Sequence, residues 1–334
     1  MKKRHWAPII YTVLIFLVIL SFHSYQNIMA MVTPPSEKWG SEMYIDKTPY
    51  KKPASIGMDE DNIWILAAKK DRFTKTTIER DKGRIKETQD IIIPGAALDK
   101  IVKYKIMRSY IFWTENYELY MSKEGRNNDY SSKKLILEEV KDFNVFSYKG
   151  ETIVAVAFDK GLRHYKIDGE NIAKWGEDYI FEKPSRIASA IDDSGTCHTV
   201  AIRSMSPMEK EVIYLLFSEG KWSSKVEKVE NVHRTNEIVG SLEIGLDKEL
   251  AYIFYGNNAA NNSSQSARIW YATVPLGKAE KSEINFKALV SGGAEGLEDF
   301  YISEISCPVY QEETLKAVVV QNYFDYIQEG FKIL

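Results

Sequence analysis

The chain has 334 residues with 44 basic and 47 acidic side chains, so its net charge is −3. Its composition, 44% hydrophobic and 27% charged, excludes a wholly disordered chain, a collagen and a coiled coil, and a mean hydropathy of −0.31 excludes a polytopic membrane protein. Aromatic residues make up 12% of the chain, including 20 Tyr and 7 Trp, and this excess favours β structure.

The first thirty residues have the pattern of a membrane anchor. Lys2, Lys3 and Arg4 precede an apolar run over residues 6–22, and no acidic residue occurs before Glu37. Basic residues ahead of such a run hold the N-terminus in the cytoplasm, so the rest of the chain crosses the membrane. We expect a cytoplasmic tip and signal-anchor transmembrane helix in residues 1–30, a stalk in 31–40 and one extracytoplasmic domain in 41–334.

A cleaved signal peptide is the alternative interpretation of this segment, and it also places the body outside the cytoplasm. Its best cleavage site follows Ala30, but Ile28 is too large for the −3 position. Residues 31–334 keep 41 of the 44 basic residues and all 47 acidic ones, a net charge of −6. This acidic balance excludes an electrostatic surface for nucleic acid.

Short strand-like runs fill the chain from residue 41 onward. They are rich in β-branched and aromatic residues and are separated by polar turns, which predicts an all-β domain. The clearest predicted strands are residues 62–68, 110–113, 152–158, 162–167, 211–217, 250–255, 268–274 and 316–323.

A repeat of 40–50 residues connects these runs. Gly150 and Gly195 each precede two strands and then a Lys-Trp pair, which ends at Trp175 in one copy and at Trp222 in the other. Turns ahead of a β run recur along the chain near Asp61, Arg108, Gly150, Gly195, Lys248 and Glu312. Such a period with about four strands per unit is typical of a β-propeller blade, whereas a β-sandwich, the alternative, predicts no common period.

Six turns of this kind predict about six four-stranded blades, with five or seven as alternatives. The last unit is one strand short, and the alternating segment at residues 42–46 is suited to supply that strand. Pairing the first strand with the last blade would close the ring and leave fewer exposed edges.

One repeat has a recognisable relative. An apolar strand at residues 187–191 is followed by the turn Asp193-Ser194-Gly195, a strand containing His198, and later Gly220-Lys221-Trp222. This order resembles the repeats of sialidase-like (BNR/Asp-box-type) β-propellers. Activity in that family implies an arginine triad, a Tyr/Glu pair and an aspartic acid, but Arg186-Ile187-Ala188 lacks the family's proline, so no catalytic residue is carried over.

Local motifs for chemistry are weak throughout the chain. His198 lies close to Asp192, Asp193 and Ser194, and a capped hairpin turn, with Asp193 and Ser194 as caps and Gly195 at positive φ, explains this cluster better than a catalytic triad does. His164, His198 and His233 recur at similar intervals but lack metal-ligand spacing. The chain contains no nucleophile elbow, P-loop or Cys-x-x-Cys.

Three segments have plain structural interpretations beside functional ones. The acidic residues 58–62 are predicted to form a solvated turn rather than a calcium loop, and the glycine-rich residues 291–296 a connection between blades. The Asn/Ser-rich residues 257–266 are expected to be a hairpin tip or a binding loop. Cys197 and Cys307 either pair in an oxidising compartment or stay as separate buried thiols, the latter being favoured.

These observations predict a membrane-anchored, extracytoplasmic β-propeller that acts as a binding or interaction module. The sequence indicates no catalytic residue, cofactor or metal site, and a glycan or protein ligand is expected at the propeller rim. The alternatives are a sialidase-like glycoside hydrolase on the same fold and a scaffold for the assembly of cell-envelope proteins.

Overall fold

The computed structural model describes residues 43–46, 54–58, 61–69, 71–79, 82, 84–125, 129–206, 209–226, 238–258, 268–276 and 287–291, and five strands between 300 and 333. Residues 1–40, His233, Cys307 and the segment 292–299 lie outside this part of the chain. The predicted anchor and stalk therefore stay predictions, and no helix among the described residues is long and apolar enough to cross a membrane.

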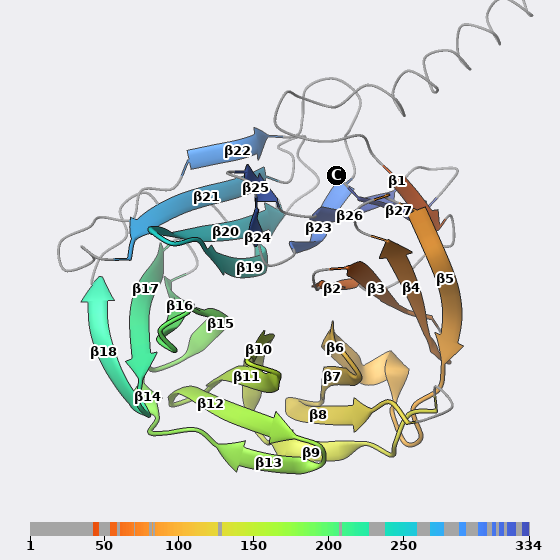
Figure 1. Cartoon of the computed structure of the whole chain (residues 1–334), viewed down its shortest axis with the longest axis horizontal. Helices are drawn as coiled ribbons and strands as arrows, with labels where there is room; N and C mark the ends of the chain where they lie inside the picture. Colours follow the sequence, from red (N-terminus) through yellow and green to blue (C-terminus); the bar gives the residue numbers. More distant parts are fainter. Residues whose placement is uncertain are drawn as a thin grey trace, which may run out of the picture.

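The described chain is an all-β propeller, as predicted (Figure 1). Five blades are each a contiguous stretch whose strands pair antiparallel in chain order from the centre outwards. Blade 1 contains β2 (Ser55–Met58), β3 (Asn62–Ala68), β4 (Phe73–Glu79) and β5 (Arg84–Ile91). Blade 2 follows the short helix η1 (Leu98–Lys100) and contains β6 (Ile101–Met107), β7 (Tyr110–Glu115), β8 (Glu118–Lys123) and β9 (Lys134–Leu137).

Blades 3 to 5 repeat this arrangement. Blade 3 contains β10 (Val140–Tyr148), β11 (Glu151–Phe158), β12 (Gly161–Asp168) and β13 (Asn171–Lys174), with β14 (Tyr179–Ile180) added to β12. Blade 4 contains β15 (Pro184–Ile191), β16 (Cys197–Ser206), β17 (Glu209–Ser218) and β18 (Lys221–Val226). Blade 5 contains β19 (Ile238–Leu246), β20 (Leu250–Asn258), β21 (Arg268–Pro275) and β22 (Lys287–Ser291).

A further four-stranded sheet joins the two ends of the chain. Its order is β1 (Met43–Asp46), β27 (Glu329–Ile333), β26 (Val319–Phe324) and β23 (Phe300–Ile305), so β1 closes the ring as the sequence predicted. A separate hairpin, β24 (Val309–Gln311) and β25 (Thr314–Lys316), lies between β23 and β26 in the chain. Where the sequence predicted about six blades, the structure has five blades of contiguous strands, one of the two alternative counts, and this composite sheet closes the ring.

The hairpin explains two errors in the predicted pattern. The single strand predicted over residues 316–323 is wrong, because Lys316 pairs within the hairpin while β26 pairs with β23 and β27. Five of the six recurring turns connect the first and second strands of a blade, whereas the turn near Glu312 belongs to the hairpin. The hairpin is an insertion between β23 and β26, and it therefore lengthens the last apparent repeat.

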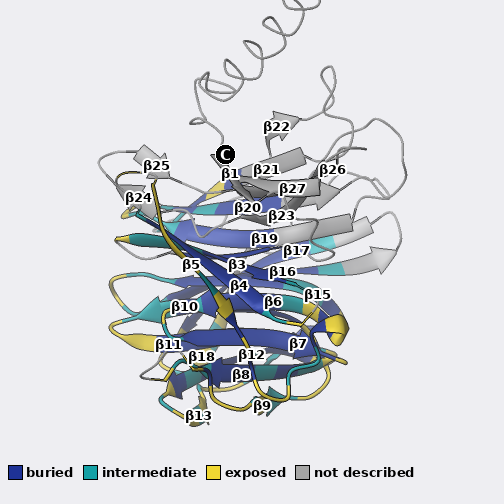
Figure 2. Cartoon of the chain, turned by 90° about the vertical axis from the view of Figure 1, so that its right-hand side faces the viewer, coloured by how far each residue is buried: buried dark blue, intermediate teal, exposed yellow. Residues whose placement is uncertain are grey.

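The core lies between blades rather than inside one layer (Figure 2). Each face of a middle strand packs on a neighbouring blade, which is why β7 and β11 are almost wholly buried and mostly apolar. Close packing recurs at the turns: a Cβ on Gly176, whose φ is +76°, would lie 2.4 Å from the carbonyl oxygen of Gly220 in the next blade.

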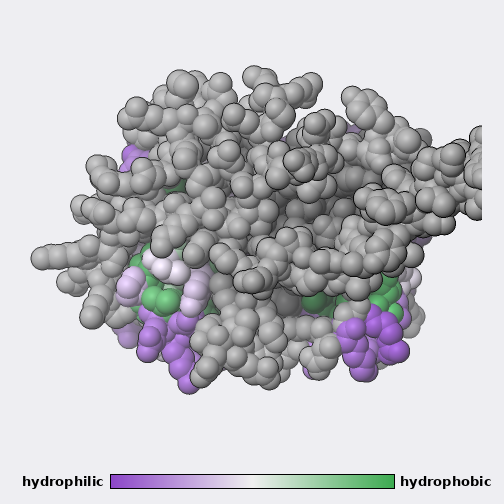
Figure 3. Space-filling view, turned by 90° about the horizontal axis from the view of Figure 1, so that it is seen from above, coloured by the Kyte–Doolittle hydropathy of each residue, from purple (hydrophilic) through white to green (hydrophobic). Residues whose placement is uncertain are grey.

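The outer strand of blade 1 is the exposed edge of its sheet. β5 has the sequence RIKETQDI and is exposed along most of its length, so charged side chains line an edge that would otherwise pair with another chain. Among the described atoms visible in Figure 3, hydrophilic and hydrophobic side chains adjoin one another rather than forming one broad apolar area.

Deleting residues 41–46 is expected to lower the melting temperature sharply. The deletion removes β1, whose antiparallel pairing with β27 joins the two ends of the ring, and leaves β27 as an open edge. Thermal unfolding followed by circular dichroism measures the change, with a deletion of residues 33–38 in the predicted stalk as the control. Equal melting temperatures for both deletions would contradict ring closure by β1.

Candidate functional site

A repeated β-bulge marks the first strand of several blades. The register between first and second strands shifts near the start of β6, β10, β15 and β19, and further along the strand in β23. A bulge turns the next side chain to a new direction and is frequent beside functional sites. The residues that follow the five bulges are Lys103, Asp142, Arg186, Ser241 and Glu304, all of them polar.

The first strands surround the centre of the ring, so the bulges set polar positions in register around it (Figure 1). Because side chains alternate along a strand, the residue two positions further on faces the same way. This second position is occupied by Lys105, Asn144, Ala188 and Glu243. The result is two tiers of positions, one beside the bulges and one deeper along the strands.

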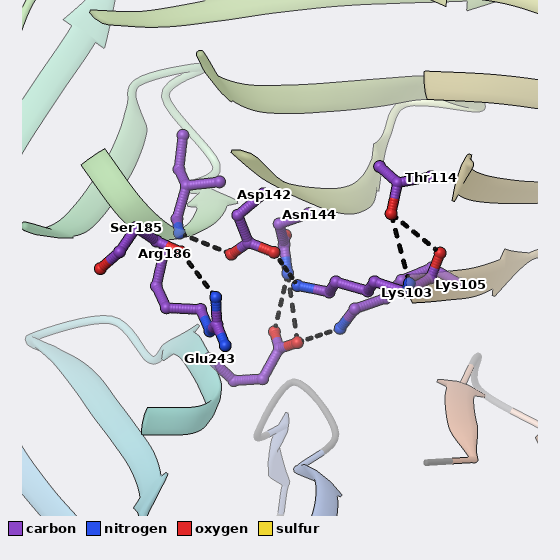
Figure 4. A network of polar contacts seen from close by, with 9 residues as sticks. Lys103, Lys105, Thr114, Asp142, Asn144, Ser185, Arg186 and Glu243 are labelled. Atoms are coloured by element: carbon purple, nitrogen blue, oxygen red, sulfur yellow. Dashed lines mark hydrogen bonds and ion pairs between the residues drawn. The ribbon is translucent and has the colours of Figure 1, made fainter. Parts of the chain in front are cut away.

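In the deeper tier, three side chains from three blades meet. Glu243 of β19 forms an ion pair with Lys105 of β6, which lies on the opposite side of the ring centre (Figures 1 and 4). The amide nitrogen Nδ2 of Asn144 lies 3.2 Å and 3.0 Å from the two carboxylate oxygens of Glu243 and donates to them. All three side chains are almost completely buried, so this contact ties blades 2, 3 and 5 across the centre.

The tier beside the bulges is more exposed to solvent. Lys103 donates from Nζ to Oδ1 of Asp142 at 2.7 Å, and its side chain is 24% exposed while that of Asp142 is 2% exposed. The other oxygen of Asp142 accepts the backbone N–H of Ile187 at 2.9 Å. Arg186 is partly exposed, and its Nη1 donates to the carbonyl oxygen of Ser185 at 2.7 Å. Figure 4 shows the two tiers as one polar network.

This network was missed at the sequence level, although a signal was present. Lys103 and Lys105, and likewise Asp142 and Asn144, are polar residues two apart within first strands that are mostly apolar. The two pairs occupy equivalent positions in the first strands of successive repeats, and these positions face the centre of the ring. Within the described part of the chain, no group of three or more His, Cys, Asp or Glu residues has the arrangement of a metal site.

The turn at residues 192–196 is a capped hairpin turn, but the capping residue is Asp192 rather than the predicted Asp193. Oδ1 of Asp192 accepts the hydroxyl of Ser194 at 2.6 Å and the backbone N–H of Thr196 at 2.9 Å, and Gly195 has a φ of +91°. Asp192 begins the turn, so its carboxylate reaches back over it, while Asp193 is exposed at the tip.

His198 is the central member of a chain of hydrogen bonds and is not part of a catalytic triad. Its Nε2 lies 3.1 Å from Oδ2 of Asp192, and its Nδ1 lies 2.5 Å from the buried hydroxyl of Tyr214. Burial alone would raise the pKa of Asp192, yet the hydrogen bonds from Ser194, His198 and the backbone of Thr196 lower it. Ser194 donates to Asp192, so serine, histidine and aspartate do not form a nucleophile relay here.

His164 belongs to β12 of blade 3 and is fully buried at the interface between blades 3 and 4. Its Nε2 lies 3.8 Å from Sγ of Cys197, and its ring stacks on Trp222 with centroids 4.8 Å apart. Desolvation lowers the pKa of His164 to about 3 and raises the pKa of Cys197 to about 12. Both groups therefore stay neutral near pH 7, and Cys197 is a buried free thiol.

The remaining sequence predictions fall partly outside the described residues. Asp61 is exposed in the turn between β2 and β3, but Asp59 and Glu60 lie outside. β20 and β21 pair from Asn257 and Arg268, so the Asn/Ser-rich segment does interrupt two paired strands, although residues 259–267 lie outside. The two Lys-Trp pairs do not mark equivalent blade positions, because Lys174 ends β13 whereas Lys221 begins β18. Trp175 and Trp222 instead meet at one interface, where both pack on Phe217 with centroids 4.9 Å and 4.8 Å away.

Comparison with known proteins supports a shared fold and little more. No family model matches the chain, and no curated protein matches it. The structure is similar to AofleA from Arthrobotrys oligospora, with a TM-score of 0.51 and 11% identity over 89% of this chain and 90% of that one. At this identity the likeness concerns the fold alone.

Two further solved structures have lower scores. The Nup133 β-propeller domain of Vanderwaltozyma polyspora gives a TM-score of 0.49 and 11% identity over 86% of this chain and 82% of that one. The pyranose dehydrogenase PQQ domain of Coprinopsis cinerea gives 0.47 and 9% over 87% and 94%. The strand topology supports the resemblance to sialidase-like propellers at the level of the fold.

Proposed function

We propose that this chain is a membrane-anchored, extracytoplasmic β-propeller that acts as a binding module, with its ligand site in the polar network at the ring centre. The propeller fold is suited to binding or interaction in general. The observation that carries the proposal is the convergence of five charged side chains from four blades, Lys103, Lys105, Asp142, Arg186 and Glu243, at one place. Anchoring in the cell membrane rests on Lys2, Lys3, Arg4 and the apolar residues 6–22.

Binding is favoured over glycoside hydrolysis by the state of the two carboxylates. Hydrolysis needs one carboxyl group to donate a proton and another to act as base or nucleophile. Both oxygens of Asp142 accept donors, from Lys103 and Ile187, and both oxygens of Glu243 accept donors, from Lys105 and Asn144. The described network also contains one arginine, where a sialidase-like site would use three.

The experiment is a glycan and peptide array probed with the full chain in detergent, together with two variants. Lys103→Gln removes the partly exposed cation of the network. Lys141→Gln is the matched control, because Lys141 lies on the adjacent blade and pairs with the exposed Asp159 at 3.1 Å. We expect binding that Lys103→Gln weakens at least tenfold and Lys141→Gln leaves unchanged.

A blank array, or binding that both variants keep, would contradict this site. Release of reducing sugar from an array ligand would favour the hydrolase. A stable protein complex recovered from cell-envelope extract, unaffected by Lys103→Gln, would instead favour the scaffold for envelope assembly.

A further inference from the structure

We propose that Lys105 and Asn144 form a binding site for a carboxylate group, and that Glu243 occupies this site as an internal substitute for the ligand. This inference rests on the proposed binding function and names the chemistry that the ring centre recognises. The geometry is that of a carboxylate receptor: an ammonium group and an amide N–H₂ from two adjacent blades hold both oxygens of one carboxylate.

The two carboxylates of the network are held differently. Asp142 is fixed by a backbone N–H, that of Ile187, in addition to Lys103, so its position is part of the strand framework. Every contact described for Glu243 comes from a side chain, Lys105 or Asn144, and Glu243 reaches them from across the ring centre. Release of Glu243 therefore breaks contacts between side chains alone, whereas release of Asp142 would also leave the backbone N–H of Ile187 without this acceptor.

The tier beside the bulges is the more exposed side of this site. Lys105, Asn144 and Glu243 are almost completely buried, whereas Lys103, one tier closer to the bulges, is 24% exposed and Arg186 is partly exposed. An anionic ligand would meet these two cations before it reached Lys105. Because Glu243 competes for the site, the apparent affinity for a free carboxylate is the intrinsic affinity multiplied by the fraction of molecules in which Glu243 has left the site.

The test is rescue of a Glu243→Ala variant by added carboxylate. Removing the Glu243 side chain leaves Lys105 and Asn144 with a vacant space between them, and we expect a lower melting temperature than in the parent chain. Acetate or formate should raise that temperature in proportion to the logarithm of its concentration, whereas chloride at equal ionic strength should not. Glu151→Ala, which breaks an exposed ion pair with Lys166, is the matched control and should show no rescue.

Glucuronate and N-acetylalanine then distinguish the two sources of such a group, an acidic sugar and a peptide C-terminus. The double variant Lys105→Met/Glu243→Ala should lose the response to all four carboxylates. If Glu243→Ala does not fold, Glu243→Gln removes the competing charge, and displacement of its neutral side chain by ¹³C-labelled acetate is measured by nuclear magnetic resonance.

Failure of every carboxylate to stabilise or bind these variants beyond the chloride control would overturn the inference. An array ligand that depends on Lys103 while rescue fails would leave the binding function standing and refute this site. Rescue together with a blank array would support the carboxylate site and refute the proposed glycan or peptide ligand.

Discussion

Replacing Lys105 with methionine is expected to lower the free energy of unfolding by about 3–5 kcal/mol, the usual cost of leaving a buried charge without its partner. The side chains of Lys105 and Glu243 are 6% and 4% exposed, so water cannot replace the lost ammonium group. The double variant Lys105→Met/Glu243→Gln should recover most of the loss, because it removes both charges and keeps an acceptor for Asn144. Urea unfolding at neutral pH measures all three proteins.

The control for this prediction is Lys166→Met. Lys166 pairs with Glu151 at 2.8 Å, but the two side chains are 37% and 47% exposed, and an exposed pair contributes about 0–1 kcal/mol. Lys105→Met and Lys166→Met with equal effects would show that the contact across the ring centre is solvated in solution.

Acidification is expected to destabilise the propeller through His164. Its pKa is about 3 in the fold and about 6.5 in an unfolded chain, so the unfolded state binds the extra proton first. The stability that neutral His164 contributes is complete above pH 6.5. It then falls by about 1.4 kcal/mol per pH unit as the pH decreases towards 3.

A His164→Leu variant isolates this effect from other titrations. Asp178, Asp192 and Asp247 have lowered pKa values, so they also lose stabilising interactions in acid, but they do so in both proteins. The unfolding free energy of the parent chain should therefore fall more steeply than that of His164→Leu between pH 6.5 and 4. Parallel curves would show that His164 becomes protonated without opening the interface between blades 3 and 4.

The different environments of His164 and His198 explain why the sequence could not assign their roles. Both are histidines on strands of neighbouring repeats, 34 residues apart. His164 faces an aromatic cluster between blades and lies near Cys197, whereas His198, next to that cysteine, faces the opposite side and bonds Asp192 and Tyr214. Side chains alternate along β16, so Cys197 and His198 face opposite sides of blade 4. The spacing of the two histidines in the sequence contains no information about which residues a neighbouring blade presents to each of them.

The sequence by itself determined the all-β class, most strand positions and the closure of the ring by residues 43–46. Those features follow from local rules, since apolar alternation, turn residues and a common period are all written along the chain. The tertiary structure decided which residues meet at the ring centre. Lys105 and Glu243 are 138 residues apart and belong to blades on opposite sides of the ring. Only the curvature of the closed ring and the repeated bulges bring their charges together, because an ion pair between distant blades leaves no local pattern.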